Sequence, residues 1–357
     1  MKNIHSYIKE YGNLTFDEKG FTEVDNVILS MIPYIPLKDI IPKINEGGIT
    51  IFEAYQKFKK KHSLKEVKNS GIAIKKASLM FPVLAESKRY QSLILGNFYY
   101  ESGADYQFGA CTITINKNLI FVAFEGTDDL VAGWLEDFKM SYEYPVMAQK
   151  IAIDYLKNIT KLFGPNIIVG GHSKGGNLAL VSSMNLPLLK KHKLINIYCN
   201  DAPGLRKREI ESLRYKSIER KLINFIPNGS IVGVILRHKH QQVVKSYAIG
   251  PFQHDAFTWE VDNDKFVRTT QKKSSLKLNK AILSWLDKHS DEERKEIVLS
   301  MFKIFEEANI KDLRDFRNDK LNNLIKMINA SKSLDVKTKD VARTGISLLI
   351  AEFINTK

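Results

Sequence analysis

The sequence predicts an α/β fold that is built on a mostly parallel central sheet. Three short segments carry this prediction because they are almost continuously apolar: 166–170 (NIIVG), 194–199 (LINIYC) and 222–226 (LINFI). Runs of this kind are typical of strands that are buried on both faces of a parallel sheet. Segments with a helical spacing of apolar residues lie between them, and strands that alternate with helices indicate a parallel arrangement.

Further elements are predicted on either side of these strands. Two β-rich segments, 107–115 and 119–124, are separated by Asn116-Lys117-Asn118, which predicts a hairpin. The remaining predictions are a helix over 147–162, strands over 231–236 and 243–248, a helix whose capping box starts at Ser290, and a last apolar helix over 346–353.

We expect three parts along the chain of 357 residues. Residues 1–90 are predicted to form a helical N-terminal extension that packs on the core. Residues 91–275 hold the sheet with its helices, and residues 276–357 form a helical C-terminal extension. A chain of this length buries about three quarters of its unfolded surface, so it needs neither a disulfide nor a metal ion for stability.

The formal net charge is +14, from 54 basic and 40 acidic residues. Such a balance attracts polyanions, which include nucleic acid, phosphorylated substrates and the anionic face of a membrane. The basic residues are nevertheless mixed with acidic ones along the whole chain, and no nucleic-acid-binding motif accompanies them. We therefore rank nucleic acid last among the partners and expect a lysine-rich but ordinary surface.

Two cysteines, Cys111 and Cys199, lie far apart and outside any CxxC or Cys/His cluster, which argues against a secreted disulfide scaffold and a structural zinc site. The N-terminal segment carries charges throughout, unlike a signal peptide. The two longest uncharged runs, 175–189 and 222–236, are too short for a bilayer that needs about 20 apolar residues. We expect a cytoplasmic protein, with peripheral attachment at the inner membrane face as an alternative.

The strongest chemical motif is Gly171-His172-Ser173-Lys174-Gly175, which follows a predicted buried strand and opens a predicted helix. In this context G-x-S-x-G is typical of a nucleophilic serine on a tight strand-to-helix turn. The first amides of the new helix point toward any negative charge that develops beside the hydroxyl. We predict Ser173 as a nucleophile; the alternative is a glycine-rich turn without chemistry.

A serine hydroxyl needs a base, and the chain has eight histidines. His254 is the best candidate because it follows the last predicted strand, where the chain order serine, acid, histidine places the base. His172 is adjacent to Ser173, and neighbours on such a turn point apart, which favours a structural role. The others are expected at the surface or in turns: His5, His62, His192, His238, His240 and His289.

Asp201 is the predicted acid. It comes directly after an apolar strand, where a carboxylate can orient the imidazole and stabilise its charged form. The alternative is that Asp201 only shapes the Asp-Ala-Pro-Gly turn. The exit of the next strand, Pro227-Asn228-Gly229-Ser230, carries no carboxylate, and Asp255 is badly placed to orient the histidine next to it.

Acyl transfer also needs hydrogen-bond donors for an oxyanion. The backbone N–H of Lys174, just after the nucleophile, is one predicted donor. The second is expected in the segment 124–129 (FEGTDD), where Gly126 permits a close approach and Thr127 can donate through its amide or its hydroxyl. An ordinary turn is the alternative for this segment.

Taken together, these segments resemble a known family. VAFEGTDDLVAGWLEDF, GGHSKGGNLAL, NDAPG and GPFQHDAFTWEV are similar to segments of the bacterial Mbeg-like proteins, which are similar in turn to the class 3, fungal-type lipases. The resemblance extends from about Phe21 to Leu313. It implies an α/β-hydrolase fold in which Ser173 is the nucleophile and His254 the base.

The resemblance also bears on the oxyanion donor and the acid. Thr127 aligns with the oxyanion-hole residue of the lipases' F-R-G-[ST] motif, in which Glu125 here replaces the arginine. The lipases' acid aligns with Ser230. This difference leaves either Asp201 as the acid or a weakened triad.

The sequence therefore favours a serine hydrolase, esterase-like or lipase-like, that cleaves a carboxylic ester of a small molecule or lipid and needs no cofactor. A thioesterase or an acyltransferase would use the same groups. The alternative from another class is a non-catalytic scaffold that binds an anionic membrane or a protein partner. The basic segment 205–221 is expected to be a solvated amphipathic helix; as the functional alternative it forms a lid, where Arg206, Lys207 and Arg208 recruit anionic headgroups.

Overall fold

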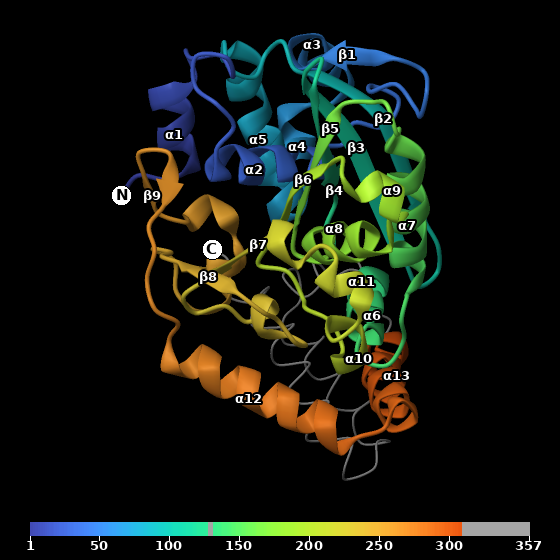
Figure 1. Cartoon of the computed structure of the whole chain (residues 1–357). Coiled ribbons are helices and arrows are strands. Elements are labelled where there is room, and N and C mark those ends of the chain that lie inside the picture. Colours follow the sequence, from blue (N-terminus) through green and yellow to red (C-terminus); the bar gives the residue numbers. More distant parts are fainter. Residues whose placement is uncertain (128–130, 309–357) are drawn as a thin grey trace.

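The structure, a computed structural model, describes residues 1–127 and 131–308 (Figure 1). Its main sheet has eight strands, whose order in space is also their order in the chain. These are β1 (Gly48–Thr50), β2 (Ile94–Ser102), β3 (Gln107–Asn116), β4 (Leu119–Phe124), β5 (Asn166–His172), β6 (Leu194–Asn200), β7 (Leu222–Pro227) and β8 (Gln241–Val244). A separate small hairpin pairs β9 (Val261–Asp262) with β10 (Lys265–Phe266).

Strand direction divides the main sheet into two parts. The strands β1 to β4 pair antiparallel, and β4 to β8 pair parallel. The parallel register sets Phe124 beside Gly171, and Gly171 beside Cys199, so β4, β5 and β6 end at the same level. The loops that leave these carboxyl ends converge at one edge of the sheet, which is where open α/β sheets bind their ligands.

Helices cover both faces of this sheet (Figure 1). On one face α2 packs against β4 and β5, and on the other α8 packs against β4, β5 and β6. The helices are α1 (Ile4–Tyr11), α2 (Glu23–Ser30), α3 (Ile51–Lys61), α4 (Leu64–Asn69), α5 (Ile72–Glu86), α6 (Val131–Lys139), α7 (Met147–Ile159), α8 (Lys174–Asn185), α9 (Leu188–Lys191), α10 (Lys207–Ile210), α11 (Leu213–Lys216), α12 (Lys273–Lys288) and α13 (Asp291–Glu307). Short 3-10 segments are η1 (Ile32–Tyr34), η2 (Glu219–Lys221), η3 (Val232–Val234), η4 (Gly250–His254) and η5 (Ala256–Thr258).

The side chains of β4 show how the sheet separates two hydrophobic clusters. Phe121 and Ala123 join the cluster that contains the N-terminal helices α1, α2, α3 and α5. Val122 and Phe124 join the cluster beneath α7 and α8. Successive residues of a strand point to opposite faces. The strand is therefore apolar throughout because both of its faces are covered.

Two expectations about single elements need correction, two strands are additional, and one predicted helix is not tested. The strands β1 and β2 were not predicted, because they form the antiparallel edge, where partial exposure interrupts the apolar pattern. Residues 231–236 are not a strand; they hold the 3-10 turn η3, in which Gly233 N–H bonds to two side chains rather than to a neighbouring strand. The strand β8 lies at Gln241–Val244 and not over 243–248. The helix predicted over 346–353 lies outside the described residues.

Other expectations are confirmed. Ser290 caps α13 through the predicted capping box with Glu293. A mostly parallel eight-stranded sheet with helices on both faces is the expected α/β architecture, and with Ser173 on the turn after β5 it is an α/β-hydrolase fold. None of the helices in the described part of the chain combines the length and the apolar character that spanning a bilayer requires.

Candidate active site

Ser173 lies on the turn between β5 and α8. Its backbone has φ 57° and ψ −132°, a conformation that residues with a side chain rarely adopt. Two hydrogen bonds hold this turn, from Ser173 N–H to Asn200 O (2.9 Å) and from Gly176 N–H to Ser173 O (3.0 Å). A Cβ on Gly171 would be 2.2 Å from the carbonyl carbon of Gly175, so the two glycines of the motif are needed for a turn this tight. A strained strand-to-helix elbow is typical of a serine nucleophile.

His254 is the last residue of η4, and its imidazole faces Asp201. His254 Nδ1 is 2.7 Å from Asp201 Oδ2, and 13% of the histidine side chain is exposed. When the neutral ring donates from Nδ1 to the carboxylate, the lone pair is on Nε2. This is the tautomer that accepts a proton from a hydroxyl.

Asp201 is fully buried, and its two oxygens have different partners. Oδ1 accepts hydrogen bonds from the Ser230 hydroxyl and from Gly233 N–H (3.0 Å), whereas Oδ2 faces His254. The turn that supplies these donors is held by α12, because the Ser275 hydroxyl donates to Ser230 O (2.6 Å). Two fixed donors thus hold the carboxylate in place and leave one oxygen to orient the imidazole.

The place of Ser230 explains how the site differs from the lipase pattern. Ser230 follows β7, where the resemblance places the lipases' acid, while Asp201 follows β6. The Ser230 hydroxyl donates to the Asp201 carboxylate. A carboxylate from one strand and a hydroxyl from the next therefore stand together beside the imidazole.

Asp255 does not take part in this arrangement. One of its oxygens caps η5 by accepting from Phe257 N–H (3.1 Å), and the other pairs with Lys76 on α5. The carboxylate that is adjacent to His254 in sequence is thus turned to other partners.

His172 supports His254, a role that the sequence did not reveal. The two rings are 4.5 Å apart between centroids, and His172 Nε2 is 2.7 Å from the carbonyl oxygen of His254. The Tyr34 hydroxyl donates to the backbone carbonyl of His172 (3.2 Å). Burial and the charge of His254 lower the pKa of His172 to about 3. His172 therefore stays neutral at neutral pH.

The loop after β4 passes directly over the elbow. A Cβ on Gly175 would be 2.2 Å from Phe124 O, and a Cβ on Gly126 would be 2.6 Å from His172 O. The two backbones are therefore in contact on both sides of the nucleophile. Thr127, the next residue of this loop, is held at the same turn.

The two predicted oxyanion donors come from Thr127 and Lys174. The Thr127 hydroxyl donates to Asp137 on α6. Because that hydroxyl is occupied, the amide of Thr127 is its remaining donor. The amide of Lys174 is the first of α8, and the first amides of a helix have no acceptor within it. The sequence left the choice between the amide and the hydroxyl of Thr127 open, and this geometry favours the amide.

A buried ion pair lies behind these amides. The Lys174 ammonium is completely buried, donates to Gln107 O (2.8 Å) and pairs with Glu136 on α6 (3.2 Å). Glu136 also accepts from Ala148 N–H at the start of α7 (2.7 Å). The side chain next to the nucleophile thereby ties α8 to the helix that follows the Thr127 loop.

Asp137, next to Glu136, is a carboxyl group with an altered pKa. Desolvation raises the pKa of Asp137 to about 7, although the Lys174 ammonium and the Thr127 hydroxyl both lower it. Within residues 1–127 and 131–308, Asp137 Oδ1 has no hydrogen-bond partner. The ionised form is therefore poorly stabilised, and the group titrates near neutral pH.

The basic segment 205–221 does not project from the molecule as one helix. It forms α10, α11 and η2, and its residues Ile210, Tyr215 and Ile218 are buried in the cluster beneath α8. Arg206 forms ion pairs with Glu209 (2.8 Å) and Asp291 (3.2 Å). Arg206 is therefore engaged in packing this segment against α13 and is not presented to an anionic headgroup.

The remaining cysteines and histidines have other surroundings. Cys111 and Cys199 are buried and free, and burial raises the pKa of both thiols. His238 bonds to Asn224 (3.0 Å), and burial lowers the pKa of His238 to about 4. In the part of the chain that the structure describes, no group of three or more His, Cys, Asp or Glu side chains is arranged to hold a metal ion.

Three solved structures are similar to this chain at low identity. The M37 lipase is 12% identical, with 58% of this chain and 68% of that one covered and a TM-score of 0.35. The Rhizomucor miehei lipase in its propeptide complex is 13% identical, with 57% of this chain and 68% of that one covered and a TM-score of 0.34. The lipase from Rhizopus microsporus var. chinensis is 16% identical, with 56% of this chain and 72% of that one covered and a TM-score of 0.26. Likenesses this distant do not bear on the chemistry of the site.

No curated protein sequence matches the chain. The model of the family described as Mbeg1-like matches residues 84–303, from the end of α5 into α13. The match covers more than half of the chain and includes Ser173, Asp201 and His254, and the chain therefore belongs to the Mbeg1-like family.

Proposed function

We propose that this protein is a serine hydrolase that cleaves a carboxylic ester, of a small molecule or a lipid, through an acyl-enzyme on Ser173. The observation that carries the proposal is the bond between His254 Nδ1 and the buried Asp201 carboxylate, with the His254 ring 4.5 Å from the ring of His172, the residue before Ser173 in its strained elbow. A buried acid that orients a histidine next to such a serine is the constellation of acyl-transfer enzymes, and it is recognised by geometry and not by chain position.

The reaction would take place in two steps. The Ser173 hydroxyl attacks the ester carbonyl while His254 Nε2 takes its proton, and the amides of Thr127 and Lys174 stabilise the oxyanion. The protonated imidazole, stabilised by Asp201, then gives the proton to the leaving alcohol. Water attacks the acyl-enzyme with the same histidine as base, which regenerates the free serine.

The same groups would serve thioester hydrolysis or acyl transfer to an alcohol. These reactions differ in the leaving group and the acceptor. Product analysis with matched oxygen and sulfur esters, in the presence and absence of an alcohol acceptor, separates them.

A fluorophosphonate probe tests the proposal without knowledge of the substrate, because it labels activated serines. We expect the wild type to be labelled, Ser173→Ala to be unlabelled, and His254→Ala to be labelled at least about 100 times more slowly. Ser274→Ala, at an exposed serine of α12, is the matched control and should behave as wild type.

The non-catalytic scaffold makes the opposite prediction. A folded wild-type protein that is not labelled, or labelling that persists in Ser173→Ala, would contradict the hydrolase. Measuring circular dichroism and the melting temperature of each variant ensures that the comparison is made between folded proteins.

A further inference from the structure

The excess of positive charge is concentrated on three neighbouring helices. Residues 51–76, which form α3, α4 and the start of α5, contain eight lysines and only two acidic residues. Both acids are used locally: Glu53 accepts from Thr50 N–H (3.0 Å) and Glu66 from Ser63 N–H (2.7 Å), which caps their own helices. Seven of the eight lysines are exposed. This part of the chain contributes a net +6 to the total of +14.

Large apolar side chains are exposed among these lysines. On α3, Phe52 is 47% exposed, and Leu64 at the start of α4 is 61% exposed. On α5 the exposed residues Lys75, Leu79 and Val83 follow one another at a spacing of four residues. Residues four apart lie on the same side of a helix. We call the outward side chains of residues 51–83 on α3, α4 and α5 the basic face.

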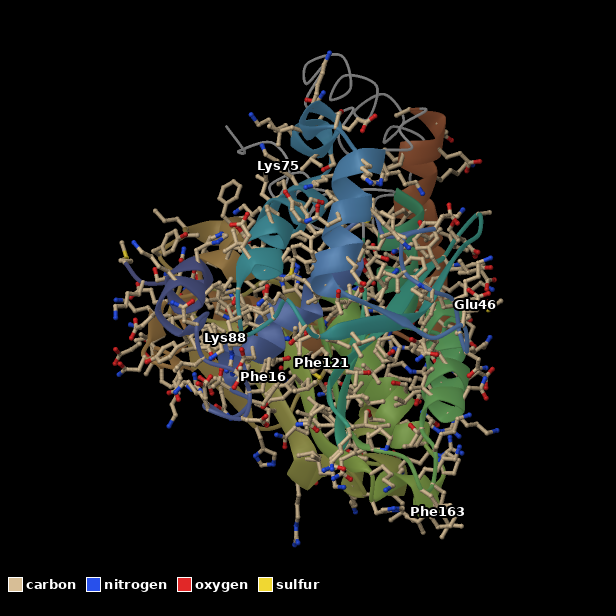
Figure 2. The ribbon with its side chains drawn as sticks, turned by 90° about the horizontal axis from the view of Figure 1, so that it is seen from above. Phe16, Glu46, Lys75, Lys88, Phe121 and Phe163 are labelled. Atoms are coloured by element: carbon tan, nitrogen blue, oxygen red, sulfur yellow. The ribbon has the colours of Figure 1, made fainter. Side chains whose placement is uncertain are left out.

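The basic face continues to the candidate site. Lys76 on α5 pairs with Asp255, the residue after His254. Ile249, which precedes η4, is 79% exposed. Figure 2 shows Lys75 at the outer end of α5, far from Lys88, which follows the other end of this helix. The end of α5 that carries Lys75 and Lys76 is thus the end that contacts the loop of His254.

We propose that the basic face docks the protein on an anionic lipid surface and thereby brings the mouth of the Ser173 site to that surface. Lysines beside a membrane are attracted by anionic headgroups, and exposed Phe and Leu side chains enter the boundary of headgroups and acyl chains. Three of the four exposed apolar side chains, Leu64, Leu79 and Val83, are aliphatic and suit acyl chains. Phe52 is the one of the four with a ring for the base stacking that single-stranded nucleic acid requires. The delivery of an ester to Ser173 rests on the proposed function, whereas the docking itself does not.

The test is co-sedimentation of the full chain with vesicles. Wild type should bind vesicles of equimolar phosphatidylglycerol and phosphatidylcholine, should bind pure phosphatidylcholine weakly, and should lose binding as salt shortens the Debye length. The variant in which Lys57, Lys60, Lys65 and Lys68 are replaced by Gln should need roughly tenfold more anionic lipid for half-binding.

The matched control replaces four lysines that are also exposed but lie on α7, directly after it and on the β3–β4 turn, away from α3, α4 and α5. These are Lys117, Lys150, Lys157 and Lys161, and their replacement by Gln should change half-binding less than about twofold. A third variant, Phe52→Ser with Leu64→Ser, should weaken binding severalfold and leave its salt dependence unchanged. The apolar and electrostatic contributions are thereby measured separately.

Several results would overturn the docking surface. The first is that wild type binds neutral vesicles as well as anionic ones, and the second is that the two lysine variants lose binding equally. The third is that the variant of Lys57, Lys60, Lys65 and Lys68 binds vesicles as wild type does but no longer binds a DNA duplex. Ser173→Ala should bind vesicles as wild type does. If vesicle binding follows the prediction while no serine is labelled by the fluorophosphonate, the docking stands and the hydrolase fails.

Discussion

Asp25 and Asp201 are both fully buried aspartates, but their hydrogen-bond partners differ in kind. Asp25, on α2, accepts from Arg89 Nε (2.9 Å) and Nη2 (2.6 Å) and from the hydroxyls of Tyr90 (2.6 Å) and Tyr7 (3.1 Å). All of these donors keep their protons near neutral pH, because a guanidinium is always charged and burial raises the pKa of both tyrosines. The cluster joins α1, α2 and the chain after α5.

Asp201 has such fixed donors on one oxygen alone. Ser230 and Gly233 hold Oδ1, and Oδ2 faces His254. An imidazole is the side chain whose charge changes most readily near neutral pH. The comparison teaches how to tell two uses of a buried carboxylate apart: one that is saturated by permanent donors stabilises the fold, and one that keeps an oxygen for a titratable base orients that base.

The substitution Asp201→Asn tests whether this carboxylate orients the base, and it has the largest expected effect on turnover. The amide would donate to His254 Nδ1 and so favour the tautomer with its proton on Nε2, which cannot accept one from Ser173. We expect kcat for a soluble ester to fall about 10⁴-fold. The melting temperature should change little, because the amide oxygen still accepts from Ser230 and Gly233. A fall of less than about tenfold would show that Asp201 does not orient the base.

The corresponding change in the Asp25 cluster is Arg89→Met, which removes the cation that pairs with Asp25. We expect its main effect on stability. It leaves the Asp25 carboxylate buried without its cation, and breaking a buried pair in this way typically costs about 3–5 kcal/mol of unfolding free energy. Urea denaturation measures this loss. The rate of fluorophosphonate labelling per folded molecule should remain within about twofold of wild type.

The double variant Asp25→Asn/Arg89→Met is the control for this prediction. It removes both charges and should recover part of the lost stability. A labelling rate that fell together with stability in Arg89→Met would break the comparison, since the Asp25 cluster would then also position the site.

The sequence predicted the parts of the site that are local. A buried strand, G-x-S-x-G and a helix lie within about twenty residues, and each of them restricts the backbone at Ser173. The position of Asp201 at the end of a parallel strand was also predictable, because parallel strands end at one edge. What the pattern left open was whether Asp201 faced the histidine or only shaped its turn.

The contacts between distant segments were not predictable from the pattern. Residues 231–236 are apolar enough for a strand, yet the Gly233 amide bonds to Asp201, thirty-two residues earlier. The side chain of His172 looked structural because it neighbours Ser173, and only the folded chain brings the carbonyl of His254 to it. Asp137 lies in an ordinary helical segment, and its pKa is raised by desolvation and, to a smaller extent, by the charge of Glu136.

A smaller effect is expected when the support of the base is removed. His172→Phe keeps a ring against His254 but loses the bond from Nε2 to the His254 carbonyl. We expect kcat to fall about tenfold with KM unchanged, because small displacements of a catalytic group slow the chemical step and not binding. His172→Gln, which retains a donor, should recover part of the loss. Equal rates for the two variants would assign His172 to packing alone.

The last prediction concerns the pH dependence of stability at Asp137. Desolvation raises the pKa of Asp137 to about 7 in the folded protein, against about 3.9 in an unfolded chain. Between these values the folded state holds the proton more often than the unfolded state. The free energy of unfolding therefore falls as pH rises from about 4 to about 7, by at most about 1.4 kcal/mol per pH unit, and this contribution is constant above that range.

Asp137→Asn removes this dependence, because an amide does not ionise while its oxygen still accepts from the Thr127 hydroxyl. Urea denaturation at several pH values between 5 and 8 should show the variant gaining stability relative to wild type as pH rises, with the gain complete near pH 8. Asp154→Asn, at an exposed aspartate on α7, should follow the wild-type curve in parallel. If the stability of Asp137→Asn also followed the wild-type curve in parallel, the Asp137 carboxylate would be as well stabilised in the folded protein as it is in water. The Lys174 ammonium and the Thr127 hydroxyl would then offset the desolvation of Asp137 in full, and the carboxylate would belong to the fixed hydrogen-bond network behind the predicted oxyanion loop.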